Sequence, residues 1–177
     1  MVDTPLRAVA AGMAFYGQRM PDLDIPKLAP MWHIFTLGHM VAVDLDRIAH
    51  RHGLSIADIH LLGTVRIDRP EPIRATDLAS TLDVSQAALS IRIDRLVRAG
   101  LLVKARLASD RRAFGLSLTA RGLEIADASV EAFARDAKLV RALGKISAED
   151  LASLTRIVGT LHEAMDRMIV AGLPGDT

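Results

Sequence analysis

Residues 110–122, with the sequence DRRAFGLSLTARG, constrain the fold more than any other part of this chain. The segment begins with an acid and two arginines, residue types that suit the exposed tip of a hairpin. Over residues 114–118, large apolar residues alternate with small ones, which is typical of a strand with one buried face. Thr119 follows and can cap a helix. The segment therefore predicts a charged turn, then a strand, then a helix.

The residues upstream supply the partner elements of this hairpin. Residues 75–82 predict a short helix, residues 85–98 a basic helix capped by Ser85, and residues 101–106 a strand. Helix, helix, strand, charged tip and strand is the order of a winged helix-turn-helix. We therefore expect a mainly α fold, consisting of a winged helix-turn-helix with a small β-hairpin wing and a helical dimerisation region.

The charge of the chain is concentrated in the same segment. Residues 85–112 contain seven bases and two acids, a formal charge of +5. Because the whole chain carries +1, the remainder carries −4. A basic segment on an acidic body is the electrostatic pattern of a protein that binds nucleic acid in one orientation. The alternative is a solvated charged face.

Composition and motifs exclude several other classes of function. The chain has no cysteine, so disulfides and thiolate metal sites are absent. No apolar run approaches the length of a membrane span, and no secretion signal begins the chain, so we expect a cytoplasmic protein without membrane contact. Neither a nucleotide-binding glycine loop nor a nucleophile elbow is present. We expect no enzyme activity and no cofactor.

The histidines do not indicate a metal site. Two pairs of potential ligands have the spacing that places them on one helix face, Asp46 with His50 and His162 with Asp166. Each pair lacks a third ligand, whereas zinc needs at least three from the protein. We therefore expect no bound metal.

Prolines and helix periodicity divide the chain into four parts. Residues 1–29 are expected to form a helix from Pro5 to about Arg19 and an extended linker that contains Pro21 and Pro26. Residues 30–72 are expected to form the helices of a dimerisation and pocket region. Residues 73–118 would form the DNA-binding lobe, and residues 119–177 the C-terminal dimerisation helices.

The basic helix and the hairpin tip carry the predicted DNA contacts. On the helix, Ser85 and the helix start would bind a phosphate, Gln86 an adenine edge and Arg92 a guanine or a phosphate. The full set of predicted contacts is Ser85, Gln86, Ala87, Ser90, Arg92, Arg95, Asp110, Arg111 and Arg112. At the tip, Asp110 would orient Arg112 for a minor groove, while Arg111 would contact a phosphate.

The last helix carries an apolar seam. Its apolar residues are spaced alternately by three and four positions: Leu151, Leu154, Val158, Leu161, Met165 and Met168. Such a seam suits packing against another helix. It fits an ordinary core-facing helix equally well, but several long helices outside one small lobe favour an intermolecular bundle. We therefore expect a homodimer.

The wing resembles that of MarR-type transcriptional regulators. The residues that match the signature D-x-R-x-x-x-L-x-L-T-x-x-G are Asp110, Arg112, Leu116, Leu118, Thr119 and Gly122. The positions that match the helix-turn-helix pattern of that family are Leu78, Ala79, Ser85, Leu96, Gly100 and Leu101. The resemblance implies a homodimer with interlocked terminal helices that reads a pseudo-palindromic duplex and is controlled by a small ligand.

A finer resemblance is to the urate-responsive subgroup of this family. It is carried by PDLD at residues 21–24, by the extra N-terminal helix and by RIDRL at residues 92–96. That subgroup has a tryptophan and an aspartate where this chain has Tyr16 and His60, which argues against urate itself. The resemblance implies a pocket for an aromatic or acidic small molecule, lined by Tyr16, His60, Arg92 and Arg112. The alternative is that Tyr16 and His60 are ordinary packing residues.

These observations predict a homodimeric DNA-binding regulator, a repressor that a small ligand releases from a pseudo-palindromic operator. The alternative is a winged-helix module that binds protein and makes no specific contact with DNA. A third alternative, a small hydrolase or isomerase on a helical bundle, has no motif in its favour.

Overall fold

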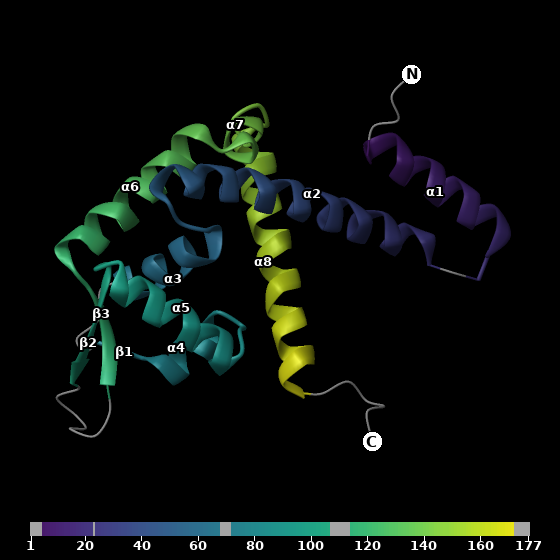
Figure 1. Cartoon of the computed structure of the whole chain (residues 1–177). Coiled ribbons are helices and arrows are strands. Elements are labelled where there is room, and N and C mark those ends of the chain that lie inside the picture. Colours follow the sequence, from purple (N-terminus) through teal and green to yellow (C-terminus); the bar gives the residue numbers. More distant parts are fainter. Residues whose placement is uncertain (1–4, 23, 68–71, 107–113, 172–177) are drawn as a thin grey trace. The chain divides into compact units, whose positions relative to one another are not determined.

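The computed structural model describes residues 5–22, 24–67, 72–106 and 114–171 of the chain (Figure 1). The chain divides into two compact units, Met1–Ala137 and Lys138–Thr177. Helices dominate the fold, and three strands form a small antiparallel sheet, which confirms the predicted fold class. The elements of the first unit are α1 (Pro5–Arg19), α2 (Ile25–Ala49), η1 (His50–His52), α3 (Ile56–Arg66), β1 (Ile73–Arg74), α4 (Ala75–Thr81), α5 (Gln86–Arg98), β2 (Leu102–Arg106), β3 (Phe114–Leu118) and α6 (Ala120–Asp136).

The N-terminal helix is confirmed, but the extended linker after it is wrong. Helix α2 already begins at Ile25 rather than at residue 30, so it includes Pro30 and also Pro26, which was expected to lie in the linker. Pro26 is tolerated because the amide groups of the first helical turn have no partner within the helix. Pro30 lies inside α2 and removes one donor from a helix of 25 residues. Both prolines are therefore accommodated near the start of one long helix.

The helix boundaries around α3 follow from local hydrogen bonds. Gly53 ends the preceding η1 turn with a left-handed φ of 70°, which favours glycine. Ser55 and Asp58 form a reciprocal capping box, in which the Ser55 Oγ accepts from the Asp58 amide and the Asp58 carboxylate accepts from the Ser55 amide. Both motifs depend on residues only a few positions apart.

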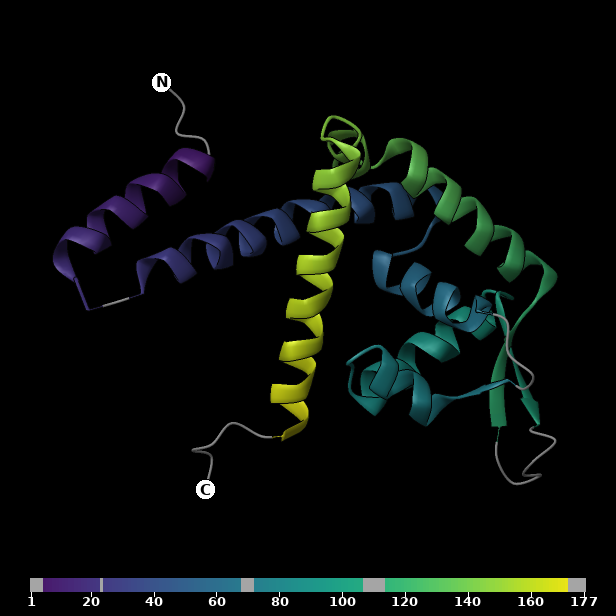
Figure 2. The same cartoon turned by 180° about the vertical axis from the view of Figure 1, so that it is seen from behind.

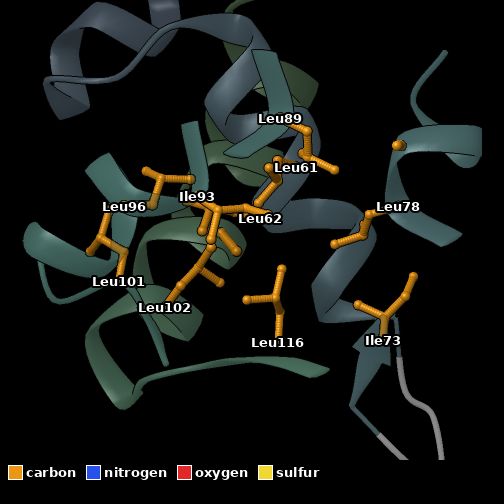
Figure 3. Packing of buried hydrophobic residues seen from close by; sticks show 12 residues of the cluster. Leu61, Leu62, Ile73, Leu78, Leu89, Ile93, Leu96, Leu101, Leu102 and Leu116 are labelled. Atoms are coloured by element: carbon orange, nitrogen blue, oxygen red, sulfur yellow. The ribbon is translucent and has the colours of Figure 1, made fainter. Parts of the chain in front are cut away.

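The core of the first unit is built by leucine and isoleucine side chains from every element of the lobe (Figure 3). The side chains of Leu61, Leu62, Leu78, Leu89 and Leu96 are completely buried. Each fully buried leucine contributes about 1.5–3 kcal/mol relative to an exposed one. This cluster fixes α4 and α5 against α3 and the sheet.

The sheet has the strand order β1-β3-β2, with antiparallel pairing throughout. Strands β2 and β3 pair from Leu102 with Leu118 to Arg106 with Phe114, which confirms the predicted hairpin. Strand β1 has only two residues, too few to show a period in the sequence, and it was not predicted. In both views the helices α3 to α5 lie on one side of the sheet (Figure 2).

Helix α6 begins in close contact with the turn before β2. The Thr119 side chain caps it, accepting from the Gly122 amide at 2.9 Å and donating to the Gly100 carbonyl oxygen at 2.7 Å. Gly122 lies so close to the Leu101 backbone that a Cβ atom there would come within 2.0 Å of the Leu101 carbonyl oxygen. Glycine at this position is therefore required by the packing of α6 on the hairpin.

Two ion pairs also join α6 to earlier helices. Arg66 of α3 contacts Asp127 at 3.0 Å, and Arg51 of η1 contacts Asp136. The hydrogen bond from Arg51 is the main reason why the pKa of the Asp136 carboxyl lies below its usual value. Both pairs are partly exposed, so they orient α6 more than they stabilise it.

The second unit contains α7 (Lys138–Leu143) and α8 (Ala148–Ala171). Ser147 caps α8, since its Oγ accepts from the Asp150 amide at 3.0 Å. The seam residues from Leu151 to Met165 are all exposed in the single chain, and the Met168 side chain lies outside the described residues. None of the helices in the described ranges combines the length and the apolar character that crossing a membrane requires.

Candidate nucleic-acid interface

Helix α5 is the candidate recognition helix. Ser85 caps it through a hydrogen bond that its Oγ accepts from the Ala88 amide at 3.2 Å. Leu89, Ile93 and Leu96 are buried and bind the helix to the core. The other sides of α5 carry its charged and polar side chains and can contact other groups.

The predicted contacts at the start of α5 lie together on the surface. Ser85, Gln86, Ala87 and Ser90 are all exposed and occupy the cap and the first turns of the helix. Gln86 and Ser90 also line a hollow of about 180 Å³ that they share with Lys104 of β2 and Phe114 of β3. These two polar side chains therefore lie on the side of α5 that faces the hairpin.

Arg92 and Arg95, in contrast, lie on the side of α5 that faces α3. The Arg95 guanidinium donates to Oδ1 of Asp58, and the Arg92 Nε lies 3.6 Å from the same oxygen. Asp58 is completely buried, and its other oxygen, Oδ2, accepts from the amide and from the hydroxyl of Ser55. One carboxylate thus caps α3 and binds two arginines of α5, so it clamps the candidate recognition helix to its neighbour.

Because Arg92 and Arg95 both pair with Asp58, their predicted contacts with DNA would be made by side chains that already have a partner within the protein. Arg92 is 23% exposed and Arg95 55% exposed, so Arg95 retains more access to solvent. Their contact with DNA stays a prediction, and each would keep Asp58 as a partner on the protein side. The sequence showed Asp58 as part of a capping box but gave no sign of the arginines, because Asp58 and Arg95 are 37 positions apart.

Other bases of the segment have partners as well. Lys104 contacts Asp94 at 3.0 Å across α5 and β2, and Arg98 donates to the Asp94 carbonyl oxygen at 3.2 Å. The Arg106 guanidinium lies 5.8 Å from the centre of the Phe114 ring, within the range of a cation–π contact. The basic charge is therefore partly neutralised and is held at defined places.

The hairpin tip carries three predicted contacts that the structure does not describe. Asp110, Arg111 and Arg112 lie in residues 107–113, outside the described residues. The strands that lead to the tip are paired up to Arg106 and Phe114. The roles of the three tip residues stay predictions.

The residues predicted to bind a ligand do not share a hollow in the described part of the chain. Tyr16 lines a hollow of about 370 Å³ between α1 and α2, together with Val9, Met13 and Trp32. His60 lies exposed on α3 and Arg92 lies beside Asp58, and neither lines that hollow. Arg112 lies outside the described residues. The four-residue pocket stays a prediction.

Sequence reasoning missed one exposed residue of α5. Ile91 is 71% exposed, although it lies between Ser90 and Arg92 in the middle of the helix. The signal was present, because Ile91 falls outside the buried period of Leu89, Ile93 and Leu96.

The potential metal ligands remain in pairs. Within the described ranges, no group of three or more histidine or acidic residues could hold a metal ion. His50 Nδ1 lies 3.3 Å from Asp46, and His162 Nε2 lies 3.8 Å from Asp166. Each contact joins two solvent-accessible side chains four positions apart.

Comparison with known proteins gives one family. A model of the MarR family matches residues 52–113. The HTH-type transcriptional regulator PecS of Dickeya dadantii (strain 3937) is 24% identical over 144 residues, 81% of this chain and 86% of PecS.

Solved structures share the fold. The MarR family transcriptional regulator AbsC from Streptomyces coelicolor has a TM-score of 0.67 at 24% identity, over 82% of this chain and 97% of AbsC. The transcriptional repressor CouR, solved bound to a 23-mer DNA duplex, has a TM-score of 0.67 at 20% identity, over 79% of this chain and 98% of CouR. The family match covers the lobe from the end of η1 to the hairpin tip, and the fold agrees over most of the chain. Residues 52–113 of this chain therefore match the MarR family, and the fold is the one seen in solved MarR-family regulators.

Proposed function

We propose that this chain binds operator DNA as a homodimer, acts as a repressor, and is released by a small aromatic or acidic ligand. The observation that carries the proposal is the placement of α5. Its apolar side is buried, its flank is clamped by Asp58, and its first turns expose Ser85, Gln86, Ala87 and Ser90. A helix held in this way before a hairpin is suited to enter a major groove.

Structures of relatives support the DNA part of the proposal. CouR was solved bound to a DNA duplex, and MepR of S. aureus, with a TM-score of 0.66 and 17% identity, was solved as a DNA complex. In our proposal Ser85 and the start of α5 bind a phosphate, and Gln86 reads a base edge. Arg112, oriented by Asp110, enters the adjacent minor groove, and Arg111 contacts a phosphate.

The dimer is supported by apolar surface that the single chain leaves exposed. Along α8 this surface consists of Leu151, Leu154, Ile157, Val158, Leu161 and Met165. Along α2 it includes Ile34, Phe35, Leu37, Met40 and Val43. Large apolar side chains left exposed in such numbers are typical of protein interfaces. A second copy, packed against these helices, would bury many of them and pair two recognition helices.

Ligand control is supported by the hollow beside Tyr16. Its lining is mostly apolar and includes Trp32, which suits an aromatic molecule. We propose that Tyr16 and His60 contact the ligand together with Arg92 and Arg112. Ligand binding that favours a DNA-incompetent arrangement of the lobes would lower operator affinity.

The test is a gel shift of the purified protein on the intergenic DNA upstream of its own gene. Specific binding that weakens steeply between low and moderate salt would support contact with several phosphates. A panel of aromatic acids, purines and phenols would then identify the effector. A protein that binds no duplex in dilute buffer would contradict the proposal and favour a protein-binding module. Unchanged ligand-induced release in Tyr16→Ala and His60→Ala variants would contradict the pocket.

Replacing Arg112 by alanine is expected to weaken operator binding by on the order of 1–3 kcal/mol, because a minor-groove contact is lost. The measurement is a binding isotherm by fluorescence anisotropy at fixed salt. Lys145→Ala, which removes one exposed charge between α7 and α8, is the control and should change affinity little. Equal affinities of the Arg112→Ala variant and the parent would count against the wing.

Replacing Leu161 by aspartate is expected to split the dimer, since it places a charge in the middle of the apolar seam of α8. Light scattering should show the mass of one chain. Ala152→Asp introduces the same charge on the opposite side of α8 and should leave the mass at that of the dimer. A dimeric Leu161→Asp variant would show that the seam does not form the interface.

A further inference from the structure

The outward side of α5 carries an apolar residue that the single chain does not cover. Ile91 is 71% exposed, the highest value among the exposed large hydrophobic residues of the described ranges. A large β-branched side chain in a helix also loses rotamer freedom, so helix propensity does not explain an isoleucine at an exposed position. Its presence there needs a reason outside the core.

The geometry of α5 defines where Ile91 points. Leu89, Ile93 and Leu96 mark the buried side of the helix. At about 100° per residue, position 91 falls opposite to that side. Ile91 therefore lies in the middle of the surface that α5 turns away from its own lobe.

The residues on either side of Ile91 face neighbouring parts of the lobe. Gln86 and Ser90 line the hollow that faces the hairpin. Arg92 and Arg95 are bound to Asp58 on the side of α3. Between these two flanks, the outward surface of α5 begins with Ala87, one turn before Ile91. The side chain of Ala87 is a single methyl group, so it leaves the Ile91 side chain free to project.

The chemistry of this surface fits one feature of a base pair. In the major groove, thymine alone presents a methyl group, and small or branched apolar side chains recognise it by contact. The nearby cations Arg95 and Arg98 suit the phosphates on either side of such a groove. We propose that Ile91 is a specificity-determining residue that packs on the C5-methyl group of a thymine in each half-site. This inference rests on the proposed DNA-binding function and names one base that helix α5 would read.

The test uses a chemical change in the DNA that removes only this methyl group. A duplex is first selected from a randomised library with the parent protein, and each thymine is then replaced in turn by deoxyuridine. For the parent, one position per half-site should lose affinity by about fourfold, the value expected for one buried methyl group. For Ile91→Ala the same replacement should change affinity by less than about twofold, because the partner of the methyl group is absent.

Matched variants separate this contact from general effects. Ile91→Val keeps branched methyl groups and should retain sensitivity to deoxyuridine. Ile67→Ala, which truncates an isoleucine that is 59% exposed at the end of α3, should behave as the parent does. Both variants alter exposed positions, so thermal unfolding should remain close to that of the parent.

Three outcomes would overturn the inference. The first is a parent that loses no affinity at any deoxyuridine position. The second is an equal loss in the parent and in Ile91→Ala. The third is a change of mass in Ile91→Ala, which would place Ile91 in an interface between chains. In all three the parent still binds a selected duplex, whereas a parent that selects no duplex at all would refute the proposed function as well.

Discussion

Replacing Gly122 by alanine is expected to destabilise the lobe by about 3 kcal/mol or more, because the new Cβ atom has no space. It would lie 2.0 Å from the carbonyl oxygen of Leu101 and 3.0 Å from the carbonyl carbon. Both atoms belong to the backbone, so no side-chain rotation can relieve the clash. The start of α6 would have to move away from the hairpin.

This movement would also break the bonds that Thr119 makes at the same junction. Its hydroxyl donates to the Gly100 carbonyl oxygen at 2.7 Å, and its amide donates to the Leu101 carbonyl oxygen at 3.1 Å. Since α6 contacts both α2 and α3, its displacement would reach the helices that carry the lobe. We therefore expect a lower midpoint of urea unfolding, followed by circular dichroism at one protein concentration.

The control for this prediction is Gly63→Ala in α3. A Cβ atom at Gly63 meets nothing within 4 Å. Alanine favours a helix interior by up to about 1 kcal/mol over glycine, so this variant should be as stable as the parent or more stable. Equal midpoints for Gly122→Ala and Gly63→Ala would show that the junction adapts to the added atom.

Replacing Asp58 by asparagine is expected to cost about 2–4 kcal/mol, since it removes the buried charge that binds two arginines. The shape of the side chain is kept, but the Arg92 and Arg95 guanidinium groups lose their shared partner. Arg95 is half exposed and can return to water, which lowers the cost below that of a fully buried pair. Arg92 is mostly covered and has less access to solvent.

The same change should also affect DNA binding. Without the clamp, α5 is less firmly oriented against α3, so operator affinity should fall more than affinity for a random duplex. Urea unfolding and anisotropy on both duplexes measure the two effects. Asp94→Asn is the matched control, because Asp94 forms an exposed pair with Lys104 that is worth less than about 1 kcal/mol. Similar losses in both variants would show that Asp58 has no special role in positioning α5.

Much of the local structure was predictable from the sequence, because it depends on groups a few positions apart. The Ser85 cap bonds to the Ala88 amide, and the Ser55 capping box closes on Asp58. Thr119 caps α6 through Gly122. Each of these bonds joins residues three positions apart, so each leaves a recognisable pattern of residue types.

Longer-range features were not predictable in the same way. Proline chemistry alone predicted an extended linker, but α2 continues through Pro30, since packing of a long helix outweighs one missing hydrogen bond. Strand β1 exists only because β3 lies beside it. Tyr16 lines the hollow between α1 and α2, and the pocket that it was predicted to share with His60 stays a prediction.

The sequence by itself determined the β2–β3 hairpin, the helix caps and the candidate recognition helix, because periodicity and capping act along one element. Only the tertiary structure decided what surrounds that helix. It brought Asp58 to Arg92 and Arg95 and placed Gly122 against Leu101. The physical reason is that these contacts join residues distant in the chain, and such distances are set by how whole elements pack together.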